Sequence, residues 1–298
     1  LHFDAVETDR IEALKRLVNI GDASAVPALG EAMADRSYTV RRQAVKGLQR
    51  ILEARHTGAA ERQQIAKVLI ATGLASRDAV VRCAAAEGLR YANDAAAGKA
   101  LLGLLVKEKD PTVRLVATRS MVGLPEAVRR NLLPQLVAGD PSVRLVVPRL
   151  LQGPADSKIA AQLLASNDAQ LSREVLRNAS QILDNAALRS AMGSADARTR
   201  ALAAQLLGER RDAASRDTLL AALSDTDGDV RAASAEGLGA LIKGAKSPDP
   251  KIVAALVGVV KNEAGDYVGV KTGDKPADPA TAVVTDKNSR AKAVAALV

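Results

Sequence analysis

Aromatic side chains are almost absent from this chain of 298 residues, which has no tryptophan, one phenylalanine and three tyrosines. A core without aromatic rings has to be built from alanine, leucine and valine, and small side chains allow helices to pack closely. The same absence removes the platforms on which single-stranded nucleic acids stack. The composition therefore favours packed helices over the recognition of unpaired bases.

Cysteine and histidine are equally scarce. Cys83 is the one cysteine, which excludes an intrachain disulfide and a metal site built from cysteines. His2 and His56 fall in different parts of the chain and have no cysteine or further histidine at ligand spacing, so we predict no metal and no cofactor. No orienting base lies near Cys83 in the sequence, and we interpret it as an inert small residue rather than a nucleophile.

Long apolar runs are missing as well. The longest uninterrupted stretch, Ile252 to Val260, is shorter than the roughly 20 residues that a membrane-spanning helix requires. A single cysteine fits a reducing compartment, which favours the cytoplasm. Because the chain begins with Leu1 and not with methionine, we expect an upstream segment to have been removed or omitted, and export stays open.

Repetition is what the sequence has in abundance. The string that runs from Asp110 to Ala117, DPTVRLVA, returns as DPSVRLVV from Asp140 and as DGDVRAAS from Asp227. A period of roughly 30 residues is typical of a solenoid, in which each unit buries its apolar face only against its neighbours. Aligned on the arginine that follows the valine, the column reads Arg10, Arg41, Arg82, Arg114, Arg144, Ser172, Arg200, Arg231 and Arg290.

The residues around this arginine predict a helix, which we call the second helix of each unit. Positions −1, +3 and +7 from the arginine are mostly apolar and share one helical face. The aspartate at position −4 is expected to be the N-cap in the units of Asp78, Asp110, Asp140, Asp168, Asp196, Asp227 and Asp286. Asp35 stands six residues before Arg41, so the cap of that helix stays open. We interpret the arginine as a ladder residue that bridges to the aspartate of the next unit.

The blocks of the form Asp-x-x-Val-Arg-x-x-Ala-x-x-Gly-Leu around Arg82 and Arg231, together with Ala25–Leu29, resemble a HEAT repeat. The resemblance is closest to the short HEAT-like repeat of the PBS-lyase type and extends over nearly the whole chain. It implies an all-α fold, a right-handed α-α superhelix whose second helices line the concave face. We therefore expect residues 1–298 to form a single array of about eight units, with Pro148 kinking or ending one second helix.

One segment, residues 262–285, interrupts the period and is predicted to be a long inserted loop. It is rich in glycine and proline, and the segments 267–270 and 282–284 are candidates for short strands. A loop of this length is either a tolerated surface insertion or a functional segment. The last repeat is incomplete at Val298 and lacks a polar cap, so we expect the natural chain to continue or this end to meet another chain.

The surface that remains for binding lies at positions +1 and +5 of the second helices, which face away from the core. Arginines beside exposed leucines suit an extended acidic and apolar peptide better than bare phosphate. The alternative is a solvated face whose arginines pair with glutamates of the array. The candidate partner-binding residues are Arg42, Lys46, Leu115, Arg119, Leu145, Arg149, Arg173 and Arg177.

The formal net charge of +8 permits an acidic partner, although mixed charges along the chain are also explained by solubility. We predict a non-catalytic protein-interaction scaffold that binds an acidic or extended protein segment in its groove, or that serves as a subunit of a larger assembly. No catalytic residue and no small-molecule ligand is expected. Two alternatives stay open: nucleic-acid binding through a basic concave face, and a bilin lyase-type accessory role with phycobiliproteins, which the family resemblance alone implies.

Overall fold

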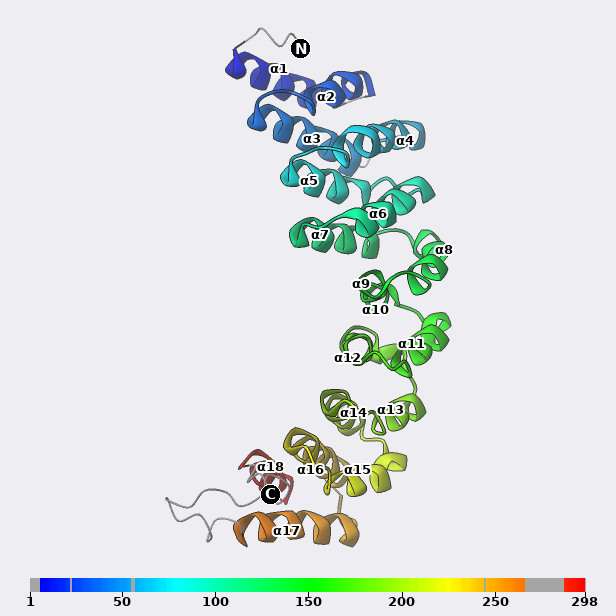
Figure 1. Ribbon diagram of the computed structural model, residues 1–298, viewed down its shortest axis with the longest axis vertical. Helices are drawn as coiled ribbons and strands as arrows, with labels where there is room; N and C mark the ends of the chain where they lie inside the picture. The colour runs from blue at the N-terminus through cyan, green and yellow to red at the C-terminus, as the bar shows by residue number, and fades with distance from the viewer. Residues whose placement is uncertain (1–5, 22, 55–56, 244, 266–286, 298) are drawn as a thin grey trace. The chain divides into compact units, whose positions relative to one another are not determined.

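The computed structural model describes residues 6–21, 23–54, 57–243, 245–265 and 287–297. Within these ranges the regular elements are helices and no strand occurs, which confirms the predicted all-α solenoid of helical repeats. The chain divides into two compact units, Leu1–Leu150 and Leu151–Val298, and each of them consists of stacked helix pairs (Figure 1).

The N-terminal unit begins with one helix and continues with pairs of a first and a second helix. Second helices stack on one another, α1 on α3, α3 on α5 and α5 on α7, while α2 packs on α4 and α6 on α8. A 3₁₀ turn, η1 (Ala23–Ala25), precedes α2, and a π-helical turn, η2 (Leu69–Gly73), continues α4. The helices are α1 (Glu7–Ile20), α2 (Val26–Ala32), α3 (Tyr38–Glu53), α4 (Ala59–Val68), α5 (Ala79–Leu89), α6 (Ala95–Lys107), α7 (Pro111–Val122), α8 (Glu126–Val137), α9 (Pro141–Arg144) and α10 (Val147–Leu150).

The C-terminal unit repeats the same arrangement. Its second helices stack as α12 on α14, α14 on α16 and α16 on α18. Short 3₁₀ turns flank several helices, at η3 (Pro154–Asp156), η4 (Ser180–Ile182) and η5 (Ala213–Ser215). The helices are α11 (Ser157–Leu164), α12 (Ala169–Asn178), α13 (Asn185–Ala191), α14 (Ala197–Glu209), α15 (Arg216–Ala222), α16 (Gly228–Ile242), α17 (Pro250–Gly265) and α18 (Lys287–Leu297).

The core is aliphatic, as the scarcity of aromatic residues predicts. In α5 the three residues at positions −1, +3 and +7, Val81, Ala85 and Leu89, are completely buried. In the C-terminal unit Leu238 of α16 packs with Leu256 of α17 in one buried cluster. Burial of a valine or leucine side chain contributes on the order of 2 kcal/mol, so the stacked apolar stripes hold neighbouring repeats together.

Aspartate caps the second helices as predicted. The carboxylates of Asp78, Asp168 and Asp196 each accept a hydrogen bond from a backbone N–H in the first turn of the helix that follows. The same holds for the remaining described members, Asp110, Asp140 and Asp227. Asp286 lies outside the described residues. In the first pair the cap is Ser37, whose hydroxyl accepts from the N–H of Val40.

The second helix that follows α7 is broken, as expected from Pro148. It is divided into α9, which ends at Arg144, and α10, which begins at Val147. Proline has no N–H to donate to the carbonyl of Arg144, four residues earlier, so the helical ladder cannot continue through this point.

The C-terminal insertion begins later than the sequence predicts. Helix α17 runs to Gly265, so residues 262–265 belong to the helix and not to the loop. Residues 266–286, with both candidate strands, lie outside the described ranges. The single array of about eight units stays a prediction.

Candidate protein-binding face

The arginine of the aligned column closes the turn before its own helix. Arg41 donates from Nη1 to the carbonyl oxygens of Asp35 and Arg36, at 2.9 and 3.1 Å. Arg82 and Arg200 donate in the same way to the carbonyls six and five residues before them. Each guanidinium thereby satisfies carbonyl oxygens of an irregular turn, which explains why the residue recurs in successive units.

The other end of the guanidinium reaches the next repeat and forms the predicted ladder. The ion pairs are Arg10 with Asp35 at 2.8 Å, Arg41 with Asp78 at 3.0 Å, Arg82 with Glu108 at 2.7 Å, and Arg200 with Asp225 at 2.7 Å. The predicted acceptor was the capping aspartate, and this is correct only for Asp78. The other three acids stand six residues before the next arginine, two residues upstream of the cap position. This position also explains Asp35, which the sequence left without a role.

The ladder acids are held in their charged form. Burial alone would raise the pKa of Asp35, but hydrogen bonds from Arg10 and from the N–H of Ser37 outweigh it and lower that pKa below its usual value. For Glu108 the hydrogen bond from Arg82 is the largest influence and lowers its pKa. The same is true of Asp225 beside Arg200, whose pKa is lowered as well.

The ion pair between repeats is made differently where Ser172 replaces the aligned arginine. Ser172 is buried, and its hydroxyl donates to the carbonyl oxygen of Leu164 at 2.9 Å, so it still ties its own turn. The ion pair with the next repeat is made instead by the neighbouring Arg173, whose Nη1 lies 2.8 Å from the carboxylate of Asp196. Arg173, a candidate partner-binding residue, is therefore mostly buried in an ion pair of the array.

The other candidate cations lie on the exposed surface of the second helices. Arg42, Lys46 and Arg119 are exposed, and within the described part of the chain none of the three makes an ion pair or a side-chain hydrogen bond. Arg149 on α10 is also exposed. Arg177 on α12 has a side chain that is 54% exposed and lies 3.5 Å from Glu174 of its own helix.

Apolar side chains accompany these cations in the N-terminal unit. Leu115 on α7 is 40% exposed, and it precedes Arg119 by one helical turn. Leu145 is half-buried. Val80, at position −2 of α5, is 42% exposed and is not among the residues predicted from the sequence. Its position is three residues before Cys83, which occupies the +1 column, so the helical period could have identified it.

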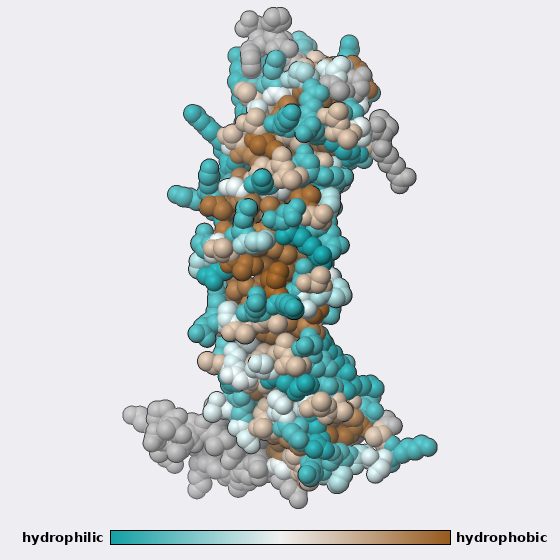
Figure 2. All heavy atoms as spheres, turned by 90° about the vertical axis from the view of Figure 1, so that its right-hand side faces the viewer, coloured by the Kyte–Doolittle hydropathy of each residue, from teal (hydrophilic) through white to brown (hydrophobic). Residues whose placement is uncertain are grey.

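We call the surface formed by the N-terminal second helices α3, α5 and α7 the second-helix face. It is not uniformly basic, because Glu87 occupies the +5 position of α5 and is exposed. The opposite surface, formed by the first helices, also carries apolar patches among hydrophilic side chains (Figure 2). On that side Val106 of α6 is exposed. Apolar exposure alone therefore does not distinguish the two faces. On the second-helix face the exposed Leu115 is followed one turn later by Arg119, an exposed arginine without an ion pair among the described residues.

A shallow groove marks the corresponding surface of the C-terminal unit. It has a volume of about 360 Å³ and is lined by residues of α12, α14, α16 and α18. Arg177 and Arg198 lie on it, and within the described residues Arg198 makes no ion pair. Asp229 and Glu236 also line the groove, so both signs of charge are present.

The described residues offer little support for metal binding, for membrane insertion or for catalysis by Cys83. No group of three histidine, cysteine or carboxylate side chains that could hold a metal ion occurs among them. No helix in the described ranges is long and apolar enough to cross a membrane. Burial is the largest influence on Cys83 and raises the pKa of its thiol, with Asp110 acting in the same direction. A thiol shifted in this direction is a poor nucleophile near neutral pH.

Comparison with known proteins supports the repeat assignment. The family model for HEAT repeats matches residues 185–269, which confirms the resemblance predicted from the sequence. No curated protein matches the chain by sequence.

Solved structures resemble the chain at low sequence identity. An engineered protein is 19% identical, with 99% of this chain and 85% of that chain covered and a TM-score of 0.40. The complex of CpcE and CpcF of phycocyanin lyase from Nostoc is 17% identical, with 87% and 91% covered and a TM-score of 0.36. A structure of tubulin recruitment by TOG-domain arrays of microtubule polymerases is 13% identical, with 99% and 82% covered and a TM-score of 0.41.

Proposed function

We propose that this HEAT-repeat chain is a non-catalytic scaffold that binds an extended acidic and apolar segment of a partner protein. The binding surface is the second-helix face, and the residues proposed to contact the partner are Arg42, Lys46, Leu115 and Arg119. One observation carries the proposal: the exposed Arg119 has no ionic partner within the described residues and follows the exposed Leu115 by one helical turn.

The contrast with the ladder supports this assignment. Arginines that hold the fold together are largely buried and paired, as Arg82 is with Glu108. Arg42, Lys46 and Arg119 stand on the same helices but take no part in that network. Lys46 and Arg119 occupy the +5 position of α3 and α7, with Glu87 at that position of α5 between them. Cations that the ladder does not use are available to a carboxylate-bearing chain that lies across the repeats.

The apolar component distinguishes a peptide from a bare phosphate backbone. Leu115 and Val80 expose aliphatic surface on neighbouring second helices. An extended peptide that alternates acidic and aliphatic side chains would cover both the cations and these apolar groups. Leu145 and Arg149 extend the proposed surface within the N-terminal unit. In the C-terminal unit Arg177 is a separate candidate contact, whereas Arg173 keeps its ion pair with Asp196.

A charge-reversal experiment tests the proposal. The probe is a fluorescein-labelled peptide of repeated Asp-Ser-Leu units, and its affinity is measured by fluorescence polarisation. The variant carries Arg42→Glu, Lys46→Glu and Arg119→Glu. Its matched control carries Lys67→Glu, Lys99→Glu and Lys107→Glu, three exposed lysines on the first helices of the same unit.

We expect the second-helix variant to weaken binding by more than about tenfold, because carboxylates of the peptide would meet like charge. The first-helix control should stay within about twofold at equal ionic strength, since it has the same net charge. Equal weakening by both variants would mean that only overall charge matters, and an absence of saturable binding by the unmodified chain would overturn the proposal.

A further inference from the structure

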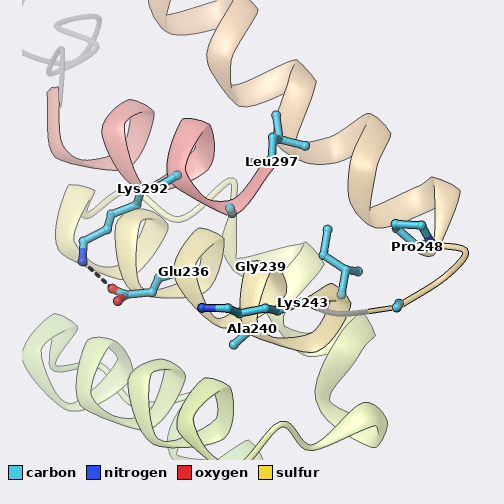
Figure 3. Close-up of a pocket in the computed structure, with 11 residues that line it drawn as sticks. Glu236, Gly239, Ala240, Lys243, Pro248, Lys292 and Leu297 are labelled. Carbon is cyan, nitrogen blue, oxygen red and sulfur yellow. Dashed lines mark ion pairs between the residues drawn. The ribbon is translucent and has the colours of Figure 1, made fainter.

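A second concave feature lies in the C-terminal unit, between helices α16 and α18 (Figure 3). Its volume is about 620 Å³, which is within the range of pockets that hold small ligands and leaves ample room for an aliphatic side chain with its neighbouring groups. Residues of α16, of the segment that leads to α17, and of α18 line it.

The walls of this pocket are firmly placed. Ala293 of α18 is completely buried in the cluster that contains Leu238 and Leu256. Gly239 of α16 faces Ala296 of α18 so closely that a Cβ atom on Gly239 would overlap the methyl group of Ala296. The pocket is therefore bounded by two helices in direct contact.

One side of the pocket has an excess of positive charge. Glu236 and Lys292 form an ion pair, with 2.6 Å between the carboxylate and Nζ (Figure 3). Lys243 is exposed, lines the same pocket, and makes no side-chain hydrogen bond or ion pair within the described residues. In Figure 3 its side chain extends along Ala240 with the ammonium group directed toward Glu236. Two ammonium groups thus face one carboxylate, and the site is one negative charge short of neutrality.

The other side of the pocket is apolar. Ile242, Pro248 and Leu297 line it, and Leu297 is 38% exposed. In Figure 3 Leu297 and Pro248 lie away from the ion pair. A ligand that matches both sides carries a carboxylate at one end and an aliphatic group at the other. A phosphate would leave the apolar wall uncovered.

The pocket is continuous with the groove described above, because Glu236 and Lys292 line both. A chain lying in the groove beside Arg177 and Arg198 can pass this ion pair and reach the pocket. This continuity favours a peptide as the occupant.

We propose that the pocket anchors one branched aliphatic side chain of a bound peptide, with an adjacent carboxylate held by Lys243 and Lys292. The proposal rests on the proposed function, which supplies the acidic and apolar segment, and adds a specific anchor in the C-terminal unit. The carboxylate accepts from the Lys243 ammonium group, and the aliphatic group packs against Leu297 and Pro248.

The experiment uses the same Asp-Ser-Leu peptide and a second peptide in which every leucine is alanine. The pocket variant carries Lys243→Gln and Leu297→Ala. The matched control carries Lys246→Gln and Val294→Ala, an exposed lysine and an exposed valine of the same region that do not line the pocket. Circular dichroism and thermal unfolding check that both variants keep their helices.

We expect the pocket variant to lose about tenfold in affinity for the leucine peptide and less for the alanine peptide, which keeps its carboxylates but has no aliphatic anchor, with the control unchanged. Equal affinities of the two variants for the leucine peptide would overturn the anchor. The proposed function would survive that result as long as the unmodified chain binds the peptide and the Arg42, Lys46 and Arg119 reversal weakens it. If the unmodified chain does not bind the peptide, both proposals fail together.

Discussion

The guanidinium of Arg10 lies 2.8 Å from the carboxylate of Asp35, and both side chains are only 2% exposed. The pair joins α1 to the turn before α3 and is the most deeply buried ion pair of the described ladder. Asp35 also accepts the backbone N–H of Ser37 at 2.7 Å, so the same carboxylate holds the turn that begins the next second helix.

Removing one partner of this pair should be costly. Arg10→Ala leaves a buried carboxylate without its cation, and we expect the free energy of unfolding to fall by about 3–5 kcal/mol. Arg41→Ala, which breaks the more exposed pair with Asp78, should cost less. Urea denaturation followed by circular dichroism measures both. Equal losses of unfolding free energy would mean that burial does not determine how much each ladder ion pair stabilises the fold.

Acid should weaken the ladder in a predictable window. The folded-state pKa of Asp225 is lowered from its ordinary value of 3.8, chiefly by Arg200. A lowered folded pKa means stability that is present above the unfolded pKa and lost as pH falls through the folded one. Stability should therefore be flat near neutrality and decline below about pH 4. Asp225→Asn should be less stable than the unmodified chain at pH 6, with a smaller difference at pH 3. A difference independent of pH would contradict this.

Two helix glycines should respond oppositely to alanine. A Cβ atom on Gly208 of α14 would lie 2.5 Å from the Cα of Gly237 of α16, so Gly208→Ala must separate the helices, and we expect a loss of more than about 2 kcal/mol. Gly103 of α6 has open space around the same position. Gly103→Ala should stabilise the chain by about 0.5–1 kcal/mol through helix propensity alone. Thermal unfolding of the two variants measures both changes in stability, the expected decrease and the expected increase, in one assay.

Cys83 should react slowly. Because burial and then Asp110 raise the pKa of its thiol, the thiolate fraction at pH 7.5 is smaller than in an unstructured peptide. Alkylation by iodoacetamide should therefore be slower than that of glutathione at this pH and should accelerate as pH rises. A rate faster than that of glutathione would reveal an activated thiol and reopen a catalytic interpretation.

The repeat period predicts the second helices well because one pattern encodes three features at once. The cap of Asp168, the buried stripe of Val81, Ala85 and Leu89, and the break at Pro148 all follow from local chemistry. The sequence correctly predicts that these arginines pair with an acid of the next repeat, but it does not predict which acid that is. Sequence spacing fixes where Glu108 stands along the chain, whereas the turn geometry decides that it, and not Asp110, meets Arg82.

The surface was harder to predict than the core. The helical period predicts that positions +1 and +5 face outward in every unit, and this is true of Arg42 and Arg119. It fails at Arg173, because the loss of arginine at Ser172 draws the neighbouring side chain into the ladder. The pocket beside Lys243 had no signal in the sequence, since it depends on how closely α18 approaches α16.

The ion pairs between neighbouring repeats affect how such a protein can change over evolution. Where the ladder is complete, a repeat brings a cation that reaches forward and an acid that receives the previous cation, as Arg41 with Asp78 and Arg82 with Glu108 illustrate. A gene duplication or deletion of one such repeat therefore leaves its junctions matched in charge. The chain can lengthen or shorten in steps of about 30 residues without leaving a buried charge unpaired. The number of repeats is therefore easier to alter than any single junction.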